Sequence, residues 1–322
     1  DGVLNMVGTF YGCKNLKEMP VIKGCIPEKT FWDCESLKEI KIGPDVFLGP
    51  AAFMKTTGVE KISVDSANPH VFEKDGIFIY QDFLDDFGEM HLSYAMPSKC
   101  PQSVSVDERT THITSCAFYG CNNLKEIDLM NIKEINGSAF ESCESLEKVT
   151  LKENSGGGIG ERAFYECKNL KQMFDLSKFG VGNYAFYKCS SLEGEITVGM
   201  IGKYAFYGCT SITKATVAYL DDYAFAECTN LKECQLGFAP PGPEREYFSA
   251  NYAFQNCTSL ERVVYYGYYS RPFICLEFKG IFEGCTSIKE VINYTEYGDK
   301  SWVCEKIAKE YPGLVKYVVY EE

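Results

Sequence analysis

The sequence has no excess of basic residues and no long apolar run. Its 322 residues carry 32 Lys and Arg against 45 Asp and Glu, which gives a formal net charge of −13 at pH 7. Nucleic acid and anionic membranes attract a basic footprint, so this charge balance argues against both as partners. No apolar stretch reaches the length of about 18 residues that a membrane-spanning helix needs, and we predict none. The first residues, Asp1-Gly2-Val3, include neither an initiator Met nor a secretion signal, so we expect any signal or anchor segment to lie outside this chain.

Ligand patterns for a metal ion are also missing. The sequence contains no Cys-x-x-Cys pair, and its three histidines, His70, His91 and His112, are scattered, which argues against a zinc site of the usual spacing. One acidic group in the same region does not match the calcium loop of an EF-hand, and we interpret it as a solvated hairpin tip. It comprises Asp82, Asp85, Asp86 and Glu89. We therefore predict no bound metal.

One glycine motif resembles a cofactor-binding loop. Residues 158–163 read Gly-x-Gly-x-x-Ala and follow a predicted strand. A dinucleotide site also requires a long helix after the glycines and an acidic residue about twenty positions further on. Instead, the stretch aligns with an ordinary connecting segment, Ile201 to Ala205, so we interpret its glycines as structural. No paired carboxylates suited to glycoside hydrolysis are apparent either, and we predict no cofactor and no enzymatic activity.

What the sequence does contain is one motif that is repeated from end to end. Phe is followed after three residues by Cys and after three more by Leu or Ile, as in Phe118, Cys121 and Leu124. Ten copies occur, and a degenerate eleventh copy lies at residues 53–59. Self-similarity with a period of about 20 to 50 residues indicates a solenoid, so we predict one elongated solenoid domain over residues 1–322. Its parts are N-terminal repeats at 1–64, a β-hairpin insert at 65–115, main repeats at 116–292 and a C-terminal cap at 293–322.

Ten of the sixteen cysteines occupy the same position of the repeat. These ladder cysteines are Cys13, Cys34, Cys121, Cys143, Cys167, Cys189, Cys209, Cys228, Cys257 and Cys285. In a stack of units their side chains point the same way along one column, whereas a disulfide requires two side chains to converge. We predict free, buried thiols that act as weak donors to the turn backbone. Cys234 takes the place of a core strand residue, and we expect it to be buried too.

Each unit is expected to contain a short helical turn at Ala-Phe-x-x-Cys and a strand at Leu-x-x-Ile-x-Leu, where apolar and polar residues alternate. Between residues 65 and 115 the repeat lapses, and Asp75-Gly76 separates two β-prone segments, which is a strong hairpin signal. Apolar residues at helical spacing over residues 301–311 predict a C-terminal capping helix. Two insertions, at residues 237–250 and 265–280, are predicted to protrude from the stack as loops.

The repeat resembles that of a known family. The unit Ala-Phe-x-x-Cys-x-x-Leu-x-x-Ile-x-Leu, the link Ile201-Gly202 and the insert pair Asn68-Pro69 and Asp75-Gly76 resemble the BspA-like leucine-rich repeat proteins of bacteria, named after bacterial surface protein A. The likeness covers essentially the whole chain. It implies a right-handed, curved leucine-rich repeat solenoid that is exposed on the cell surface or secreted. It also implies adhesion to host matrix proteins, host cells or other microbes, and it carries no catalytic residues.

Two surfaces are candidates for binding. Side chains that flank the core positions of the strands form a mixed polar face suited to protein or glycan contacts. On this face we single out Glu126, Asp128, Lys148, Lys214, Glu233 and Arg262, together with Glu39, Lys61, Thr150, Thr216 and Gln235. The second candidate is an aromatic loop in the insertion at residues 265–280, because exposed aromatic side chains are good recognition anchors. Its residues are Tyr265, Tyr266, Tyr268, Tyr269 and Arg271.

Further aromatic columns flank the repeated Phe, and we interpret them as packing between stacked turns. The column that precedes Ala-Phe contains Tyr184, Tyr204, Tyr223 and Tyr252. From the residues and the resemblance we predict a non-catalytic, monomeric interaction protein that binds a protein or glycan on host or microbial surfaces. A structural spacer in a larger surface assembly, without a ligand of its own, is the alternative.

Overall fold

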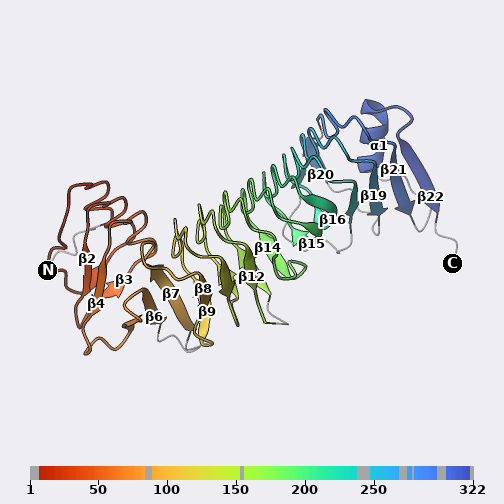
Figure 1. Cartoon of the computed structure of the whole chain (residues 1–322). Helices are drawn as coiled ribbons and strands as arrows, with labels where there is room; N and C mark the ends of the chain where they lie inside the picture. Colours follow the sequence, from red (N-terminus) through yellow and green to blue (C-terminus); the bar gives the residue numbers. More distant parts are fainter. Residues whose placement is uncertain are drawn as a thin grey trace. The chain divides into compact units, whose positions relative to one another are not determined.

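The computed structural model describes residues 7–83, 89–152, 156–237, 247–267, 274–277, 279–295 and 302–319. They fall into two compact units, unit 1 within Asp1–Leu170 and unit 2 within Lys171–Glu322. Each unit is a stack of short solenoid turns built from strands and tight turns, and the described residues include a single α-helix (Figure 1). The predicted solenoid is thereby confirmed. That the two units form one domain stays a prediction.

In unit 1, equivalent strands of successive turns pair in parallel. Strands of one side of the stack are β2 (Glu39–Ile42) with β4 (Lys61–Val64), and β8 (Ser103–Ser105), β10 (Glu126–Asp128) and β12 (Lys148–Thr150). Strands of the opposite side are β1 (Cys25–Ile26) with β3 (Phe47–Leu48), and β9 (Thr110–Ile113), β11 (Glu134–Ile135) and β13 (Gly157–Ile159). Pairing is in register, as in Ile127 with Val149, so equivalent residues form columns along the stack.

The insert in unit 1 is a β-hairpin, as predicted. Strand β5 (Val71–Lys74) pairs antiparallel with β6 (Phe78–Phe83), which pairs antiparallel with β7 (Glu89–Ala95). Asp75 and Gly76 both have left-handed backbones, with φ of 58° and 64°, which is the geometry of a type I′ hairpin turn. Strand β7 also pairs in parallel with β9, so the insert rejoins the stack along β7.

In unit 2, six parallel strands form one sheet in the order β15-β16-β17-β19-β21-β22. Their bounds are β15 (Gly194–Met200), β16 (Ile212–Tyr219), β17 (Glu233–Leu236), β19 (Arg262–Gly267), β21 (Glu290–Thr295) and β22 (Val315–Val319). The unit also contains β14 (Phe179–Val181), β18 (Tyr247–Ser249) and β20 (Ile274–Glu277). Strands β18 and β20 lie inside the two predicted loops, and they pair with each other. The prediction that both insertions are protruding loops is therefore wrong. Each insertion contributes a strand, and these two strands pair with each other.

The predicted capping helix is present as α1 (Trp302–Glu310), and it buries Cys304 and Ile307. The residue after it, Tyr311, covers the last repeated Phe: its ring lies edge-on to Phe282 at 5.5 Å, and its hydroxyl oxygen accepts a hydrogen bond from Phe282 N. Strand β22, which follows and pairs with β21, was not predicted.

The repeated Phe side chains form the centre of the stack. Phe118, Phe140 and Phe164 are fully buried, and neighbouring rings are parallel with centroids 4.9 Å and 5.0 Å apart. Each expected helical turn is a single tight turn, in which Cys121 N donates to Phe118 O at 3.0 Å. Phe118 N donates onward to Ala139 O of the next unit at 2.8 Å. The Ala-Phe motif thus couples each turn to its neighbour through both backbone and side chain.

The ladder cysteines bridge neighbouring units through their thiols. Cys143 Sγ donates to Phe118 O of the preceding unit, and Cys209 Sγ donates to Phe186 O, both at 3.0 Å. The same contact, at 2.9 to 3.1 Å, is made by Cys34, Cys167, Cys228, Cys257 and Cys285. Because the thiolate is disfavoured by burial, the pKa of Cys34 is raised to about 11 and the pKa of Cys285 to about 12.

All described cysteines are free thiols, and Cys121, Cys189 and Cys234 are buried like most of the ladder. The expectation that all ten ladder cysteines lie in the core is wrong for Cys13, which is exposed. Cys13 belongs to the first described turn, so its sulfur has no preceding Phe carbonyl within the described residues. Cys25, outside the ladder, is exposed as well.

We predict that Cys13 and Cys25 react rapidly with Ellman's reagent in the native protein, whereas the buried ladder thiols react only after unfolding. The reagent attacks the thiolate, and burial limits both access and the thiolate fraction. Titration in guanidinium should then detect sixteen reactive thiols per chain. A variant with Cys13→Ser and Cys25→Ser should lose the fast phase. Fewer than sixteen thiols after unfolding would reveal disulfides and contradict the packing described above.

Glycine is required where the link between two turns touches the preceding turn. A Cβ added at Gly202 would lie 2.7 Å from Asn183 N and 2.9 Å from Gly182 C, and one at Gly160 would lie 2.6 Å from Gly137 N. Real Cβ atoms do not approach backbone atoms so closely, so only glycine fits. The glycine motif at residues 158–163 therefore serves backbone packing.

Candidate functional site

The predicted polar face of unit 2 is a row of charges that pair with one another. Lys214, Glu233 and Arg262 are neighbours in register on β16, β17 and β19. Carboxylate oxygens of Glu233 lie 3.4 Å from Lys214 Nζ and 3.5 Å from an Arg262 nitrogen. The row continues with Glu290, 3.0 Å from Arg262, and Lys316, 2.6 Å from Glu290. The hydrogen bond from Lys316, aided by Arg262, holds the pKa of Glu290 below its ordinary value. These charges therefore satisfy each other across the strands.

The predicted face of unit 1 also carries charged residues side by side. Glu126 on β10 and Lys148 on β12 are directly in register, and both are exposed. Asp128 Oδ1 accepts a hydrogen bond from Met130 N at 3.1 Å and so stabilises the turn that ends β10. Asp128, one of the predicted binding residues, therefore has a structural role.

The predicted aromatic loop begins later than the sequence indicated. Tyr265 and Tyr266 belong to strand β19, in register with Asn293 and Tyr294 of β21. The rings of Tyr266 and Tyr294 stack at 5.3 Å between centroids. Successive strand residues point to opposite faces, so Tyr265 and Tyr266 do not share one surface. The other members of the predicted loop, Tyr268, Tyr269 and Arg271, lie outside the described residues.

The tyrosine column that precedes Ala-Phe packs between turns. Rings of adjacent units stack face to face with centroids 4.6 to 5.1 Å apart, and the four tyrosines are only partly exposed. All four have left-handed backbones with φ of 56° to 57°. The column comprises Tyr184, Tyr204, Tyr223 and Tyr252. Stacking of this kind stabilises neighbouring units against each other.

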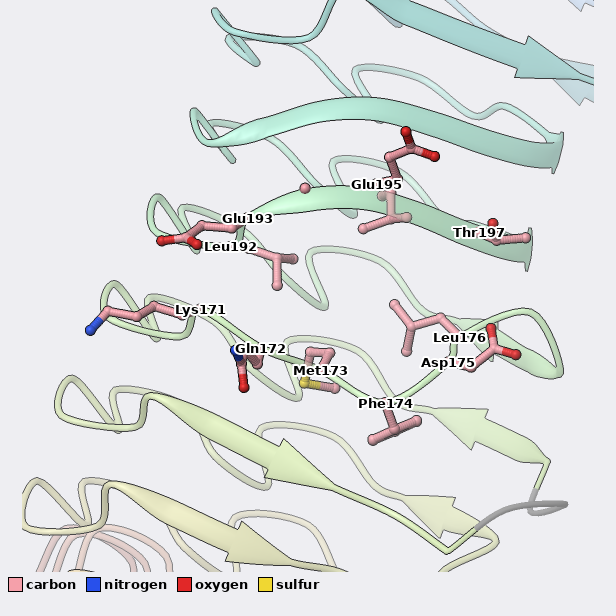
Figure 2. A pocket seen from close by; sticks show the side chains of 12 residues that line it. Lys171, Gln172, Met173, Phe174, Asp175, Leu176, Leu192, Glu193, Glu195 and Thr197 are labelled. Carbon is pink, nitrogen blue, oxygen red and sulfur yellow. The ribbon is translucent and has the colours of Figure 1, made fainter.

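A groove of about 580 Å³ lies in unit 2 between residues 171–176 and strand β15 (Figure 2). Figure 2 shows Met173, Leu176 and Leu192 between the two segments. The apolar lining comprises Met173, Phe174, Leu176, Leu192 and Ile196. The polar lining comprises Lys171, Gln172, Asp175, Glu193, Glu195 and Thr197. The groove thus combines an apolar floor with a rim that carries three carboxylates and one ammonium.

The groove exists because two successive units depart from the regular strand spacing. In regular units, buried residues follow the repeated Leu at the third and fifth positions. After Leu170 the fifth position is Asp175, and the buried Leu176 comes one residue later. Strand β15 is irregular too, with a bulge between Gly194 and Glu195. A bulge locally disrupts the ladder and re-aims the side chains beside it.

The two walls of the groove are joined near their ends. Glu193 N donates to Lys171 O at 3.2 Å, and Leu176 forms an isolated parallel bridge with Val198. Strand β15 is the edge strand of its six-stranded sheet. Strand β15 therefore presents a partly open edge to the groove, and such an edge can accept an added strand.

The electrostatics of the rim favour a cation. Glu193 and Glu195 are exposed and make no ion pair within the described part of the chain. Asp175 accepts hydrogen bonds from the backbone N and the hydroxyl of Ser177, at 2.9 and 2.8 Å. A partner with Lys or Arg beside an apolar side chain would match this combination of rim and floor. Sequence analysis missed the groove, although the displaced Leu176 was its visible signal.

No helix in the described part of the chain is long and apolar enough to cross a membrane. A family model described as BspA type leucine-rich repeat region matches the chain in six copies, over residues 7–77, 93–213 and 181–293. A comparison with curated proteins finds no match.

Solved leucine-rich repeat structures are similar to the chain. One from Eubacterium ventriosum is 19% identical with a TM-score of 0.53, covering 89% of this chain and 68% of that one. The T. pallidum protein TpLRR is 20% identical, with a TM-score of 0.49, over 77% and 99% of the two chains. A Bacteroides ovatus protein is 19% identical, with a TM-score of 0.47, over 98% and 86%. At this identity the likeness to the Eubacterium ventriosum structure concerns the fold alone, and together with the family model it confirms the predicted leucine-rich repeat architecture.

Proposed function

Since the chain belongs to the BspA-type leucine-rich repeat family, we propose that it is a surface-exposed or secreted adhesion protein that binds a protein partner through the groove of unit 2. The family and its fold support a role in protein interaction at the surface. The observation that carries the finer proposal is the groove itself, with its apolar floor and exposed carboxylates. The partner is expected on a host matrix, a host cell or another microbe.

The chemistry of the groove selects a class of partner segment. Met173 and Leu176 offer apolar contacts on one wall, whereas Glu193 and Glu195 bring negative charge to the rim along β15. An extended peptide with an apolar anchor next to Lys or Arg would satisfy both walls, and its backbone can pair with the open edge of β15. The net charge of −13 would speed its approach.

Reversing two rim charges should abolish this recognition. We expect the double variant Glu193→Lys, Glu195→Lys to bind a basic matrix protein at least tenfold more weakly, because attraction becomes repulsion. The dissociation constant is measured by surface plasmon resonance against a panel of immobilised matrix proteins and glycans. Both positions are exposed, so circular dichroism of the variant should match that of the parent.

The matched control carries the same charge change on exposed residues of unit 1, Glu108→Lys with Glu126→Lys. It should bind like the parent. Loss of binding in the control alone would instead assign recognition to the polar face of unit 1. A chain that binds no member of the panel would favour the structural spacer.

The aromatic residues of the second insertion can be tested in the same assay. A variant with Tyr266→Ser, Tyr268→Ser and Tyr269→Ser removes the half-buried ring of β19 that stacks on Tyr294, together with two tyrosines that follow it in sequence. Binding that falls in this variant, and persists in the rim variant, would move the proposed site from the groove to the aromatic residues.

A further inference from the structure

Two histidines that are separated in sequence meet on unit 1, where the hairpin insert joins the stack. His91 on β7 and His112 on β9 are direct neighbours in register, with ring centroids 4.2 Å apart. Glu89, two positions before His91, lies beside both rings: its Oε2 is 3.5 Å from His112 Nδ1 and 4.0 Å from His91 Nε2. The histidines are scattered in the sequence, but His91 and His112 are neighbours in the fold.

We propose that Glu89, His91 and His112 bind a divalent transition-metal ion, with Zn²⁺ as the best match. One ligand atom from each residue lies within 4.8 Å of the others. A tetrahedral zinc site places its ligand atoms roughly 3.4 Å apart, so small side-chain rotations complete the geometry. Two imidazoles and one carboxylate suit Zn²⁺ better than Ca²⁺ or Mg²⁺, which prefer oxygen ligands. A fourth position remains for water or for a side chain of a partner.

The surroundings hold the ligands in place and also limit affinity. Lys133 Nζ lies 3.1 Å from Glu89 Oε1, which orients the carboxylate with Oε2 toward the imidazoles. The positive charge of Lys133 repels a cation bound at this site. The Thr111 hydroxyl lies 2.8 Å from His112 Nδ1 and orients that ring. If Nδ1 is the ligand atom, this hydrogen bond must break when the metal binds.

The burial of the cluster separates it from an ordinary surface ion pair. The three side chains are only 17 to 21% exposed. Neutral imidazole is the form of histidine that binds a metal. The site shares no residue with the groove and does not rest on the proposed adhesion function.

Proton NMR gives a direct test, because the chain has only three histidines. The protein used is the full chain with Cys13→Ser and Cys25→Ser, which removes, from the part of the chain whose burial is described, the exposed thiols as competing ligands. Titration with ZnCl₂ alone should shift the imidazole signals of His91 and His112 with a stoichiometry of one and leave His70 unchanged. His70 packs on Phe47 at 4.7 Å and is the internal reference. Equal shifts of all three histidines, or none, would overturn the proposal.

Isothermal titration calorimetry with Zn²⁺ provides the affinities. His91→Gln and His112→Gln should each weaken binding by at least about tenfold, as expected for loss of one ligand, whereas His70→Gln should change it less than twofold. Removing the opposing charge with Lys133→Gln should strengthen binding by up to about tenfold. Parent-like affinity in the double variant His91→Gln, His112→Gln would contradict the site, as would displacement of Zn²⁺ by equimolar Ca²⁺.

Discussion

Replacing Phe140 by Ala is expected to lower the free energy of unfolding by about 3–5 kcal/mol. The ring is fully buried between Phe118 and Phe164 and lies nearly parallel to both. Its removal deletes two stacking contacts at once. The cavity cannot readily close, because backbone hydrogen bonds between units, such as Phe140 N to Ala163 O at 2.7 Å, fix the distance between turns. Urea denaturation followed by circular dichroism measures the loss.

The control for this experiment is Phe140→Leu, which keeps most of the volume and should cost less than about 1.5 kcal/mol. Hydrogen exchange locates the effect: in the Ala variant, amide protection should fall first at Cys121 and Cys167, whose turns flank the cavity. A loss below about 1 kcal/mol for the Ala variant would mean that the Phe column is not the tightly packed core described above.

Replacing Gly202 by Ala is expected to destabilise unit 2 by about 2–3 kcal/mol, although only one methyl group is added. The new Cβ would meet Asn183 N at 2.7 Å and Gly182 C at 2.9 Å. These are backbone atoms, which cannot rotate away as a side chain can. The two turns must therefore separate at the link, and contacts on both sides weaken. Thermal unfolding should show a lower midpoint.

Gly180 is the matched control for Gly202, because it lies on β14 of the same unit and an added Cβ meets nothing within 4 Å. Gly180→Ala should change stability by no more than about 0.5 kcal/mol. Equal losses in the two variants would point to a general effect of glycine replacement and would contradict the close approach at the link.

The repeated parts of the fold could be predicted from sequence because each repeat position has one environment. Phe118, Cys121 and Leu124 recur with fixed spacing, and a stack buries every copy of such a motif in the same column. Strands β18, β20 and β22 were missed. They lie where the repeat is interrupted or ends, and there a strand is determined by its neighbour in space.

Functional residues were harder to predict, because their contacts too depend on neighbours in space. Lys214, Glu233 and Arg262 looked like a ligand-binding column, yet residues at one repeat position are neighbours in register, and their alternating charges pair with each other. His91 and His112 meet only because β7 pairs with β9 across the insert, and no local spacing encodes that pairing.

The one-residue displacement at Leu176 was visible in the sequence, but its effect on strand pairing was not. A shift of one residue moves a side chain to the opposite face of a strand, so the ladder beside β15 fails over a few residues. The groove is therefore a local irregularity in an otherwise regular pattern of strands. In this chain, departures from the repeat indicate candidate sites better than the repeat itself.

The thiol contact between neighbouring turns has an evolutionary consequence. Cys143 reaches back only to Phe118, and Cys167 reaches back only to Phe140. No ladder cysteine described here depends on a turn beyond the adjacent one. A gene duplication or deletion of one whole unit would consequently restore every such contact at the new junction. The number of units can thus change without redesign of the interior.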